Sequence, residues 1–161
     1  MTLDATTITT PIGSLSLIAR DGAAVAAGFA TVEEMAARLD DPEVRTKRDL
    51  GGLSRAVAAY FAGDLTAMDD LAVEQPGGEF FQLAWKVMRE VPAGETINYA
   101  ELAERAGRPR AVRAAGSACA RNLVAPIVPC HRILRTGGAL GGYYYGLETK
   151  QWLLDHEQRH S

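Results

Sequence analysis

The first thirty residues show the alternation of apolar and polar positions that is typical of β-strands. Along residues 14–20, leucine and alanine side chains alternate with serine and arginine side chains. This period of two predicts a half-buried strand. We expect two further strands, at Thr7–Thr10 before a turn at Pro11–Gly13, and at Ala23–Phe29 after the turn signal Asp21–Gly22.

The pattern then changes to short helices. The segment Thr31–Glu34 has the spacing of a capping box and predicts a helix that begins there and ends near Leu39. Residues 40–52 are charged and end in two glycines, so we interpret them as a loop. The segment Leu53–Phe61 has helical periodicity. The segment Leu71–Gly78 contains Pro-Gly-Gly and is the best candidate for an inter-domain connection.

A wide apolar stripe at helical spacing follows from Glu79 and ends before Pro92. Its side chains are those of Phe80, Phe81, Ala84, Trp85, Met88 and Val91. We interpret these side chains as core packing rather than as a ligand site.

A second capping box, Asn98–Glu101, predicts a helix to about Ala106. Pro109 suits the first turn of a following helix that runs to about Ala120, so the two would form a helix-turn-helix. The second helix carries arginines separated by small residues, which allow close approach to DNA or to a neighbouring helix. The terminal segment predicts a strand at Ile133–Leu134 and a helix from Leu147 to near Glu157.

Composition excludes several classes of protein. The chain has 161 residues, 47% of them apolar, which is enough for a real core. No apolar run approaches the roughly 20 residues of a membrane span. The polar N-terminus lacks the pattern of a secretory signal, so we expect a cytoplasmic protein without a membrane partner. Two cysteines and three histidines without paired spacing predict free thiols and no metal site.

Charge is unevenly distributed along the chain. The net charge is −3, yet residues 105–135 contain seven arginines and no acidic residue. A basic window in an otherwise acidic chain is what a partner with a phosphate backbone requires. A solvated basic face without a partner explains the window equally well, so charge alone leaves both readings open.

Cys130 is the candidate nucleophile. A thiol attacks as the thiolate, and nearby positive charge lowers its pKa. His131 and Arg132 follow directly, and the basic window surrounds them, so we expect Cys130 to be held as an anion. Because neighbouring side chains on a strand point to opposite faces, contact with His131 needs a bent backbone, for which Pro129 gives a reason. Cys-His adjacency by itself fits a structural cysteine as well.

The motif Pro129–Arg132, followed by Gly141–Tyr143 and Gly146–Leu147, resembles the O6-alkylguanine-DNA alkyltransferase family. The resemblance extends from Thr10–Gly13 to Leu153–Glu157. It implies an α+β fold in two parts. Residues 1–75 would form an N-terminal α/β subdomain with a small antiparallel sheet, and residues 79–161 a mostly helical domain with the helix-turn-helix and the active-site cysteine.

The resemblance also implies roles for single residues. Cys130 matches the alkyl acceptor, His131 the histidine that takes the thiol proton through a water, and Glu157 the carboxylate that orients that histidine. Tyr99 matches the tyrosine that donates a proton toward the guanine, and Asn122 the hinge asparagine.

Arg113 matches the arginine that enters the base stack in place of the extruded nucleotide, although one more phosphate contact is its main alternative. The expected DNA-binding residues are Arg110, Arg113, Ala114, Gly116, Ser117 and Arg121. The expected substrate-pocket residues are Cys119, Pro129, Ile133, Tyr143, Tyr144 and Tyr145.

The family activity implied is the irreversible, single-turnover transfer of an alkyl group, mainly methyl, from O6-alkylguanine to Cys130. The partner would be double-stranded DNA bound through its minor groove, with the damaged base flipped out of the helix and no cofactor. We expect a monomer, and cooperative assembly on DNA stays open.

The sequence departs from the family pattern at two places, and each departure predicts a difference at the active site. Leu123 stands where a proline usually follows the hinge asparagine, so the entry to the active-site segment would be looser. Tyr144 and Tyr145 occupy positions where small residues are frequent, which predicts a narrow pocket that prefers methyl. A DNA-binding protein without catalysis and a cysteine hydrolase are the alternative functions.

Overall fold

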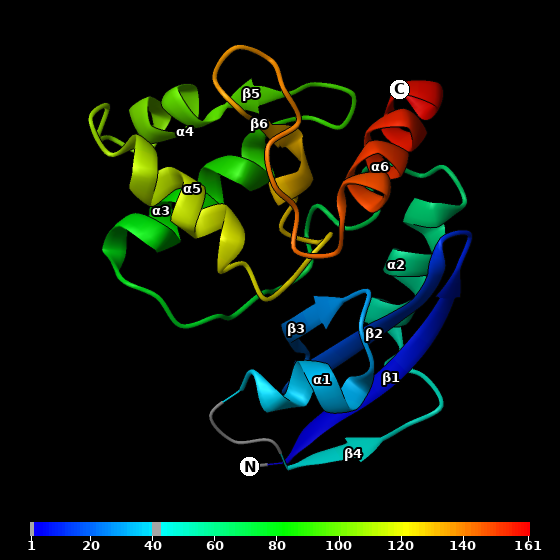
Figure 1. Cartoon of the computed structure of the whole chain (residues 1–161). Helices are drawn as coiled ribbons and strands as arrows, with labels where there is room; N and C mark the ends of the chain where they lie inside the picture. The colour runs from blue at the N-terminus through cyan, green and yellow to red at the C-terminus, as the bar shows by residue number, and fades with distance from the viewer. Residues whose placement is uncertain (1, 40–42) are drawn as a thin grey trace. The chain divides into compact units, whose positions relative to one another are not determined.

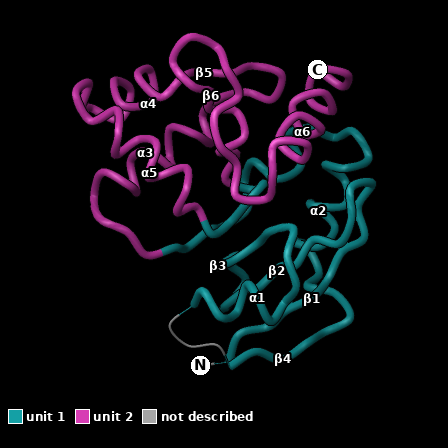
Figure 2. Tube along the Cα trace, in the orientation of Figure 1, with its two compact units in different colours: residues 1–75, 123–127 teal, residues 76–122, 128–161 magenta. Residues whose placement is uncertain are grey.

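The computed structural model describes residues 2–39 and 43–161 and divides the chain into two compact units (Figure 2). The first unit extends to Gln75 and includes Leu123–Ile127, while the second consists of Pro76–Asn122 and Val128–Ser161. The boundary at residue 75 lies in the connection expected from the sequence. Residues 123–127, which the sequence-based division left in the second part, pack with the first unit.

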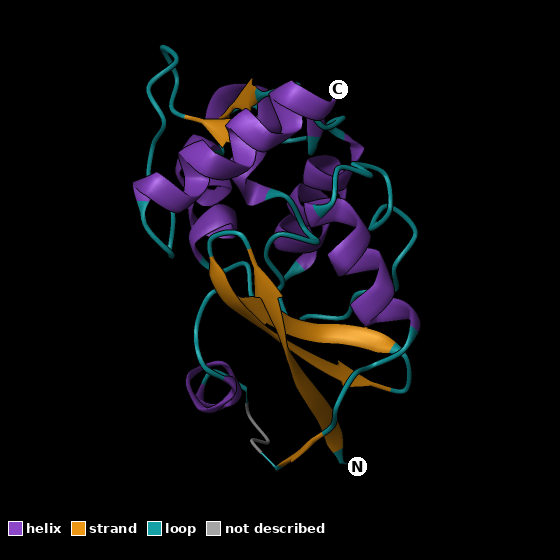
Figure 3. Cartoon of the chain, turned by 90° about the vertical axis from the view of Figure 1, so that its right-hand side faces the viewer, coloured by secondary structure: helices purple, strands orange, loops and turns teal. Residues whose placement is uncertain are grey.

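The first unit contains a four-stranded sheet with the strand order β3-β2-β1-β4. Figure 3 shows its strands in orange. Its strands are β1 (Leu3–Thr10), β2 (Gly13–Arg20), β3 (Ala23–Gly28) and β4 (Val44–Thr46). The first three pair antiparallel, and β4 pairs parallel to β1. The expected antiparallel pairing is thus present in β1, β2 and β3, and the parallel strand β4 makes the sheet mixed.

The expected loop at residues 40–52 contains β4, while residues 40–42 lie outside the described residues. The strand was not evident because it has three residues, of which only Val44 is apolar. Arg45 forms a salt bridge with Asp4 of β1 at 3.0 Å. Charged side chains are usual on a short edge strand, where they discourage pairing with other chains. Hydrophobic alternation therefore gives no signal for such a strand.

Strand β2 is buried on both faces. Ser16 and Ile18 are fully buried together with Leu15 and Leu17, so the expected half-buried alternation is wrong for this strand. The hydroxyl of Ser16 donates a hydrogen bond to the carbonyl of Ala30 at 2.5 Å, which satisfies the one polar side chain in the middle of the strand.

Two helices complete the first unit, α1 (Val32–Ala37) and α2 (Gly52–Phe61). The capping box is confirmed at the start of α1, because the Thr31 side chain accepts from the Glu34 amide and the Glu34 side chain accepts from the Thr31 amide, both at 3.1 Å. Residues 123–127 join this unit through main-chain hydrogen bonds of Leu123 and Ala125 with Ala27.

The second unit is mostly helical (Figure 1). Its elements are α3 (Glu79–Glu90), β5 (Ile97–Asn98), α4 (Tyr99–Arg105), α5 (Val112–Ala120), the 3-10 turn η1 (Cys130–Arg132), β6 (Ile133–Leu134) and α6 (Leu147–His160). Strands β5 and β6 pair parallel. The fold is α+β with a helical C-terminal part, as expected.

The core of this unit is built on the apolar stripe of α3. Phe80, Ala84, Trp85 and Met88 are buried, and the indole of Trp85 donates to the carbonyl of Ala118 on α5 at 2.9 Å. The interpretation of the stripe as core packing is confirmed for these four residues and for Val91, whereas Phe81 is half-buried.

The capping box at Asn98 is also confirmed. Helix α5 begins at Val112 and not at Pro109, because the chain first closes a turn in which the Ala111 amide donates to the carbonyl of Arg108. Within the described residues, no helix is long and apolar enough to cross a membrane.

Candidate active site

The cysteine lies on a bend of the backbone. Cys130 begins the 3-10 turn η1, which the Arg132 amide closes by donating to the carbonyl of Pro129 at 3.0 Å. The bent backbone expected from Pro129 is therefore present. Cys130, His131 and Arg132 are all buried, so each of these side chains needs partners inside the unit.

His131 and Arg132 meet the same carboxylate on the terminal helix. Nε2 of His131 lies 2.7 Å from Oε2 of Glu157. The Arg132 guanidinium donates from Nε to Oε1 at 2.8 Å and from Nη2 to Oε2 at 3.0 Å. Its Nη1 donates to the carbonyl of Val91 at 2.7 Å, which fixes the fork in one orientation. The three side chains form a buried triad that crosses from η1 to α6.

The charges of this triad follow from its contacts. Burial opposes ionisation of Glu157, but His131 and Arg132 hold the pKa of its carboxyl well below the usual range. Burial keeps the pKa of His131 below its usual value, although Glu157 acts in the opposite direction. At neutral pH we therefore take Glu157 as ionised and His131 as neutral.

This protonation state determines the tautomer of His131. An ionised carboxylate only accepts hydrogen bonds, so Nε2 carries the proton and Nδ1 presents a lone pair. Among the described residues, Nδ1 has no hydrogen-bond partner, although it is buried. The triad thus leaves Nδ1 of the residue next to Cys130 as a hydrogen-bond acceptor.

The Cys130 thiol is neutral in the resting protein. Burial raises the pKa of Cys130, while a hydrogen bond from the Asn122 side chain and the charge of Lys150 act in the opposite direction. The expectation of a resting thiolate held by the arginine window is therefore wrong. The Arg132 guanidinium pairs with the Glu157 carboxylate rather than with the Cys130 sulfur, and the side chain of Arg135 is exposed to solvent.

Asn122 joins two parts of the site. Besides its interaction with Cys130, its side-chain amide donates to the carbonyl of Val128 at 2.8 Å, and the residue is buried. It thus ties the end of α5 to the segment that leads into η1, which is consistent with the hinge position expected for it.

Lys150 is a buried cation that the sequence analysis did not single out. Its Nζ donates to the carbonyl of Ile133 at 2.8 Å, to that of Gly142 at 3.3 Å and to that of Leu140. These contacts attach β6 and the loop before α6 to the terminal helix. A lysine on an amphipathic helix normally faces solvent, so nothing in the sequence distinguished it.

A pocket of about 230 Å³ lies at Cys130. Tyr99, Cys119, Gly142, Tyr143 and Tyr144 contribute to its lining, and so do Gly116 and Ala120 of α5. Three other residues expected at the pocket do not line it. Pro129 and Ile133 are buried on either side of η1, and the ring of Tyr145 packs against that of Tyr144 at 4.9 Å.

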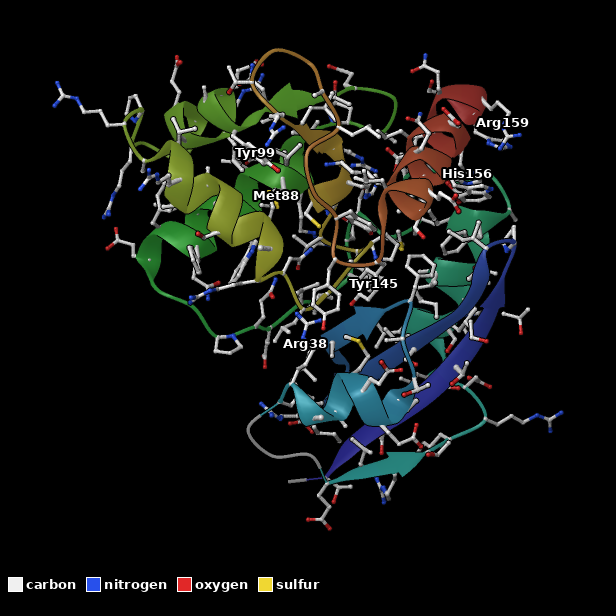
Figure 4. The ribbon with its side chains drawn as sticks, in the orientation of Figure 1. Arg38, Met88, Tyr99, Tyr145, His156 and Arg159 are labelled. Atoms are coloured by element: carbon white, nitrogen blue, oxygen red, sulfur yellow. The ribbon has the colours of Figure 1, made fainter. Side chains whose placement is uncertain are left out.

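Tyr99 is the acid available to this pocket. Burial and the nearby cysteines raise the pKa of its hydroxyl, so it stays protonated at neutral pH. Gly141 has a positive φ of 71°, and a Cβ at this position would lie 2.8 Å from the Tyr99 hydroxyl oxygen. Glycine is thus required beside the hydroxyl. Figure 4 shows Tyr99 at the start of α4.

Helix α5 presents its small and basic residues at the surface. Ala115 and Ala118 are buried, whereas Arg113 and Ser117 are exposed and Ala114 and Gly116 are partly exposed. Arg110 is exposed before the helix, and the exposed Arg121 after it has its guanidinium 5.8 Å from the ring centroid of Phe81. The helix therefore offers a surface without bulky apolar side chains beside the pocket.

From its sequence, the chain is expected to have no metal site. No group of three or more metal-ligating side chains occurs in residues 2–39 and 43–161.

His156, expected to be exposed, is buried, and its ring stacks on that of Trp152 with centroids 4.8 Å apart. His156 is labelled in Figure 4. His156 precedes Glu157 on α6, and both side chains are buried.

The fold and the site define a protein that presents a cysteine nucleophile in a small pocket beside a surface helix carrying arginine. A family model described as "6-O-methylguanine DNA methyltransferase, DNA binding domain" matches residues 79–159. A relative from Mycolicibacterium paratuberculosis, named methylated-DNA–protein-cysteine methyltransferase, is 39% identical over 155 residues, which cover 96% of this chain and 92% of that protein. The chain belongs to the 6-O-methylguanine DNA methyltransferase family.

Other relatives agree. A Shigella flexneri protein of the same name is 43% identical over 107 residues, which are 66% of this chain but only 63% of that protein, less than two thirds of its length. The crystal structure of Mycobacterium tuberculosis OGT in complex with DNA superposes with a TM-score of 0.86 at 34% identity, covering 98% of this chain and 94% of that one. An O6-methylguanine-DNA methyltransferase from Pyrococcus kodakaraensis shares the fold, with a TM-score of 0.73 at 22% identity over 96% and 98% of the two chains.

Proposed function

We propose that this protein repairs DNA by transferring an alkyl group, mainly methyl, from O6 of guanine in double-stranded DNA to Cys130. The observation that carries the proposal is the arrangement at the pocket. Cys130 and the protonated Tyr99 line one small cavity, while Glu157 holds His131 in the tautomer whose free Nδ1 is a base. The names and DNA complex of the relatives support the same reaction.

DNA binding is assigned to α4 and α5 acting as a helix-turn-helix. The exposed face of α5 carries Arg113 and Ser117, and the small side chains beside them allow the helix to approach the minor groove closely. Because Gly116 and Ala120 of the same helix line the pocket, a nucleotide flipped out at this helix has a short path to Cys130. Arg113 would fill the gap in the base stack and offset part of the few kcal/mol that flipping costs.

In the proposed mechanism, the Cys130 thiol and the His131 imidazole are both neutral before the reaction. The Cys130 proton passes through a bridging water to Nδ1 of His131, and Glu157 and its hydrogen bond stabilise the imidazolium that forms. The thiolate attacks the alkyl carbon in line, so that the S–C bond forms while the C–O6 bond breaks. The electron pair stays on guanine, and Tyr99 protonates the leaving base. The products are unmodified guanine and a thioether.

The thiolate of Cys130 is a poor leaving group, so the C–S bond of the thioether is not readily broken and each molecule reacts once. The mechanism uses the side chains of Cys130, His131, Glu157 and Tyr99 of a single chain, so we propose that one molecule carries out one transfer. The neutral, unpaired thiols Cys119 and Cys130 are consistent with a reducing compartment such as the cytoplasm.

The proposal is tested by intact mass spectrometry after incubation with duplex DNA that contains one O6-methylguanine. The expected result is the addition of one methyl group, absent in Cys130→Ser and absent with undamaged DNA. A mobility shift without a mass change would mean a binding protein. Repeated turnover of small acyl substrates would mean a cysteine hydrolase.

A further inference from the structure

The reaction pocket contains a second thiol that the proposed repair chemistry does not use. Cys119 on α5 and Cys130 on η1 both line the cavity of about 230 Å³. Both are free cysteines. The two side chains thus face the same cavity, which is smaller than the roughly 300 Å³ at which ligand pockets usually begin.

The two thiols also lie within electrostatic range of each other. Loss of contact with water raises the pKa of the Cys119 thiol, and the neighbouring Cys130 raises it further, with Lys150 acting in the opposite direction. The pKa of Tyr99 is raised by burial and by both cysteines. Lys150 likewise faces both sulfurs. Tyr99 and Lys150, on α4 and α6, thus each interact with the same pair of thiols.

We propose that Cys119 and Cys130 form a dithiol site that binds ligands of the trivalent arsenical class, with one arsenic bonded to both sulfurs. In the reaction with an arsine oxide, two As–S bonds form, the As–O double bond and two S–H bonds break, and one water leaves. The oxidation state of arsenic does not change, so no oxidant or reductant is needed. Soft thiolate ligands select soft centres of this kind.

The surroundings of the pair favour this ligand class. Both thiols are protonated at neutral pH, which suits a condensation that releases water. The tyrosine rings of Tyr143 and Tyr144, which also line the pocket, provide an apolar wall for an organic substituent on arsenic. Because both sulfurs come from one folded unit, the second As–S bond closes without the entropy cost of bringing two molecules together.

The test uses the full chain, phenylarsine oxide and no DNA, so its outcome does not depend on the proposed repair function. The protein is treated with one equivalent of the reagent, washed with a monothiol, and analysed by intact mass. Wild type is expected to retain one phenylarsenic group, which a dithiol such as 2,3-dimercaptopropanol removes. Cys119→Ser and Cys130→Ser, each with one remaining thiol, are expected to lose it roughly 100-fold faster in the monothiol wash.

A second measurement on the wild type covers the case in which a variant does not fold. After arsenical treatment the protein is denatured, alkylated with iodoacetamide and digested, and the peptides with Cys119 and Cys130 are both expected to be protected. Protection of only one cysteine, or an adduct that the monothiol removes from wild type as fast as from the single variants, would overturn the dithiol site.

Discussion

Oε2 of Glu157 lies 2.7 Å from Nε2 of His131, although the two residues are 26 positions apart in the chain. Both side chains are fully buried, and the Arg132 guanidinium binds the same carboxylate. The contact places the terminal helix in the chemistry of the cysteine turn. It keeps the proton on Nε2 and so leaves Nδ1 free to accept the thiol proton.

Replacing Glu157 by Gln should slow methyl transfer to Cys130 by about 100-fold, which is the lower range of general acid–base contributions. The amide neither stabilises the imidazolium nor fixes the tautomer. The measurement is the single-turnover rate with saturating O6-methylguanine duplex DNA. Asp155→Asn, on an exposed position of the same helix, is the matched control and should react at the wild-type rate. An unchanged rate in Glu157→Gln would remove His131 from the mechanism.

The same triad predicts that stability decreases in mild acid. The folded pKa of His131 lies below its unfolded value of about 6.5, so the unfolded chain binds more protons as pH falls through that value, and stability is lost below it. For Glu157, whose folded pKa is also depressed, the loss begins only below about 4.3.

Thermal unfolding measured between pH 7 and pH 5 separates the two contributions. The melting temperature of wild type should decrease more steeply over this range than that of His131→Gln, which lacks the buried imidazole. Parallel curves would show that His131 is not held neutral by burial.

Lys150→Met should make Cys130 less reactive at neutral pH. Lys150 is the cation that lowers the pKa of Cys130, so its removal moves the ionisation of the thiol to higher pH. A shift of one pH unit corresponds to a roughly 10-fold lower rate at pH 7. The measurement is the pH profile of iodoacetamide labelling of the Cys130 peptide, with the exposed Glu148→Gln as control. An unshifted profile would contradict the electrostatic role.

Arg113→Ala tests whether Arg113 enters the base stack. If it replaces the flipped nucleotide, the rate at saturating DNA should fall by about 10-fold, which corresponds to the loss of about 1.4 kcal/mol of stabilisation. Arg110→Ala should weaken DNA binding and its salt dependence without changing that rate. If both variants show only weaker, salt-dependent binding, Arg113 is a phosphate contact.

Tyr144→Ala should widen the range of alkyl groups accepted. Tyr144 lines the pocket and is 62% exposed, so its truncation removes bulk at little cost in stability. The ratio of inactivation rates with free O6-benzylguanine and with O6-methylguanine DNA should increase by about 10-fold, a typical effect of bulk in a pocket. Equal rates of wild type with both substrates would show that the tyrosines do not restrict the pocket.

Local signals in the sequence predicted much of the fold. The capping boxes at Thr31 and Asn98 are local hydrogen-bond patterns, so their spacing alone predicted where α1 and α4 begin. Strand β4 was missed because three residues are too few to show an apolar period, and its partner β1 lies 41 positions earlier at the Asp4–Arg45 contact.

The site was harder to predict than the fold. Cys130, His131 and Tyr99 came from a motif and a resemblance, but nothing in the sequence showed that Arg132 would bind Glu157 or that Lys150 would be buried. The resting charge of Cys130 was predicted wrongly for the same reason. The number of arginines in a window does not show which of them face Cys130. Burial raises the pKa of Cys130, and arginines that face elsewhere do not offset this effect.

Irreversible methyl transfer to Cys130 is best tested by measuring stoichiometry with isotopically labelled O6-methylguanine duplex DNA in large excess over the protein. We expect one labelled methyl group per molecule, located on the peptide that contains Cys130, with an equal amount of unmodified guanine restored in the DNA and no further reaction. Labelled methyl on another residue, or repair of more guanines than there are protein molecules, would contradict it.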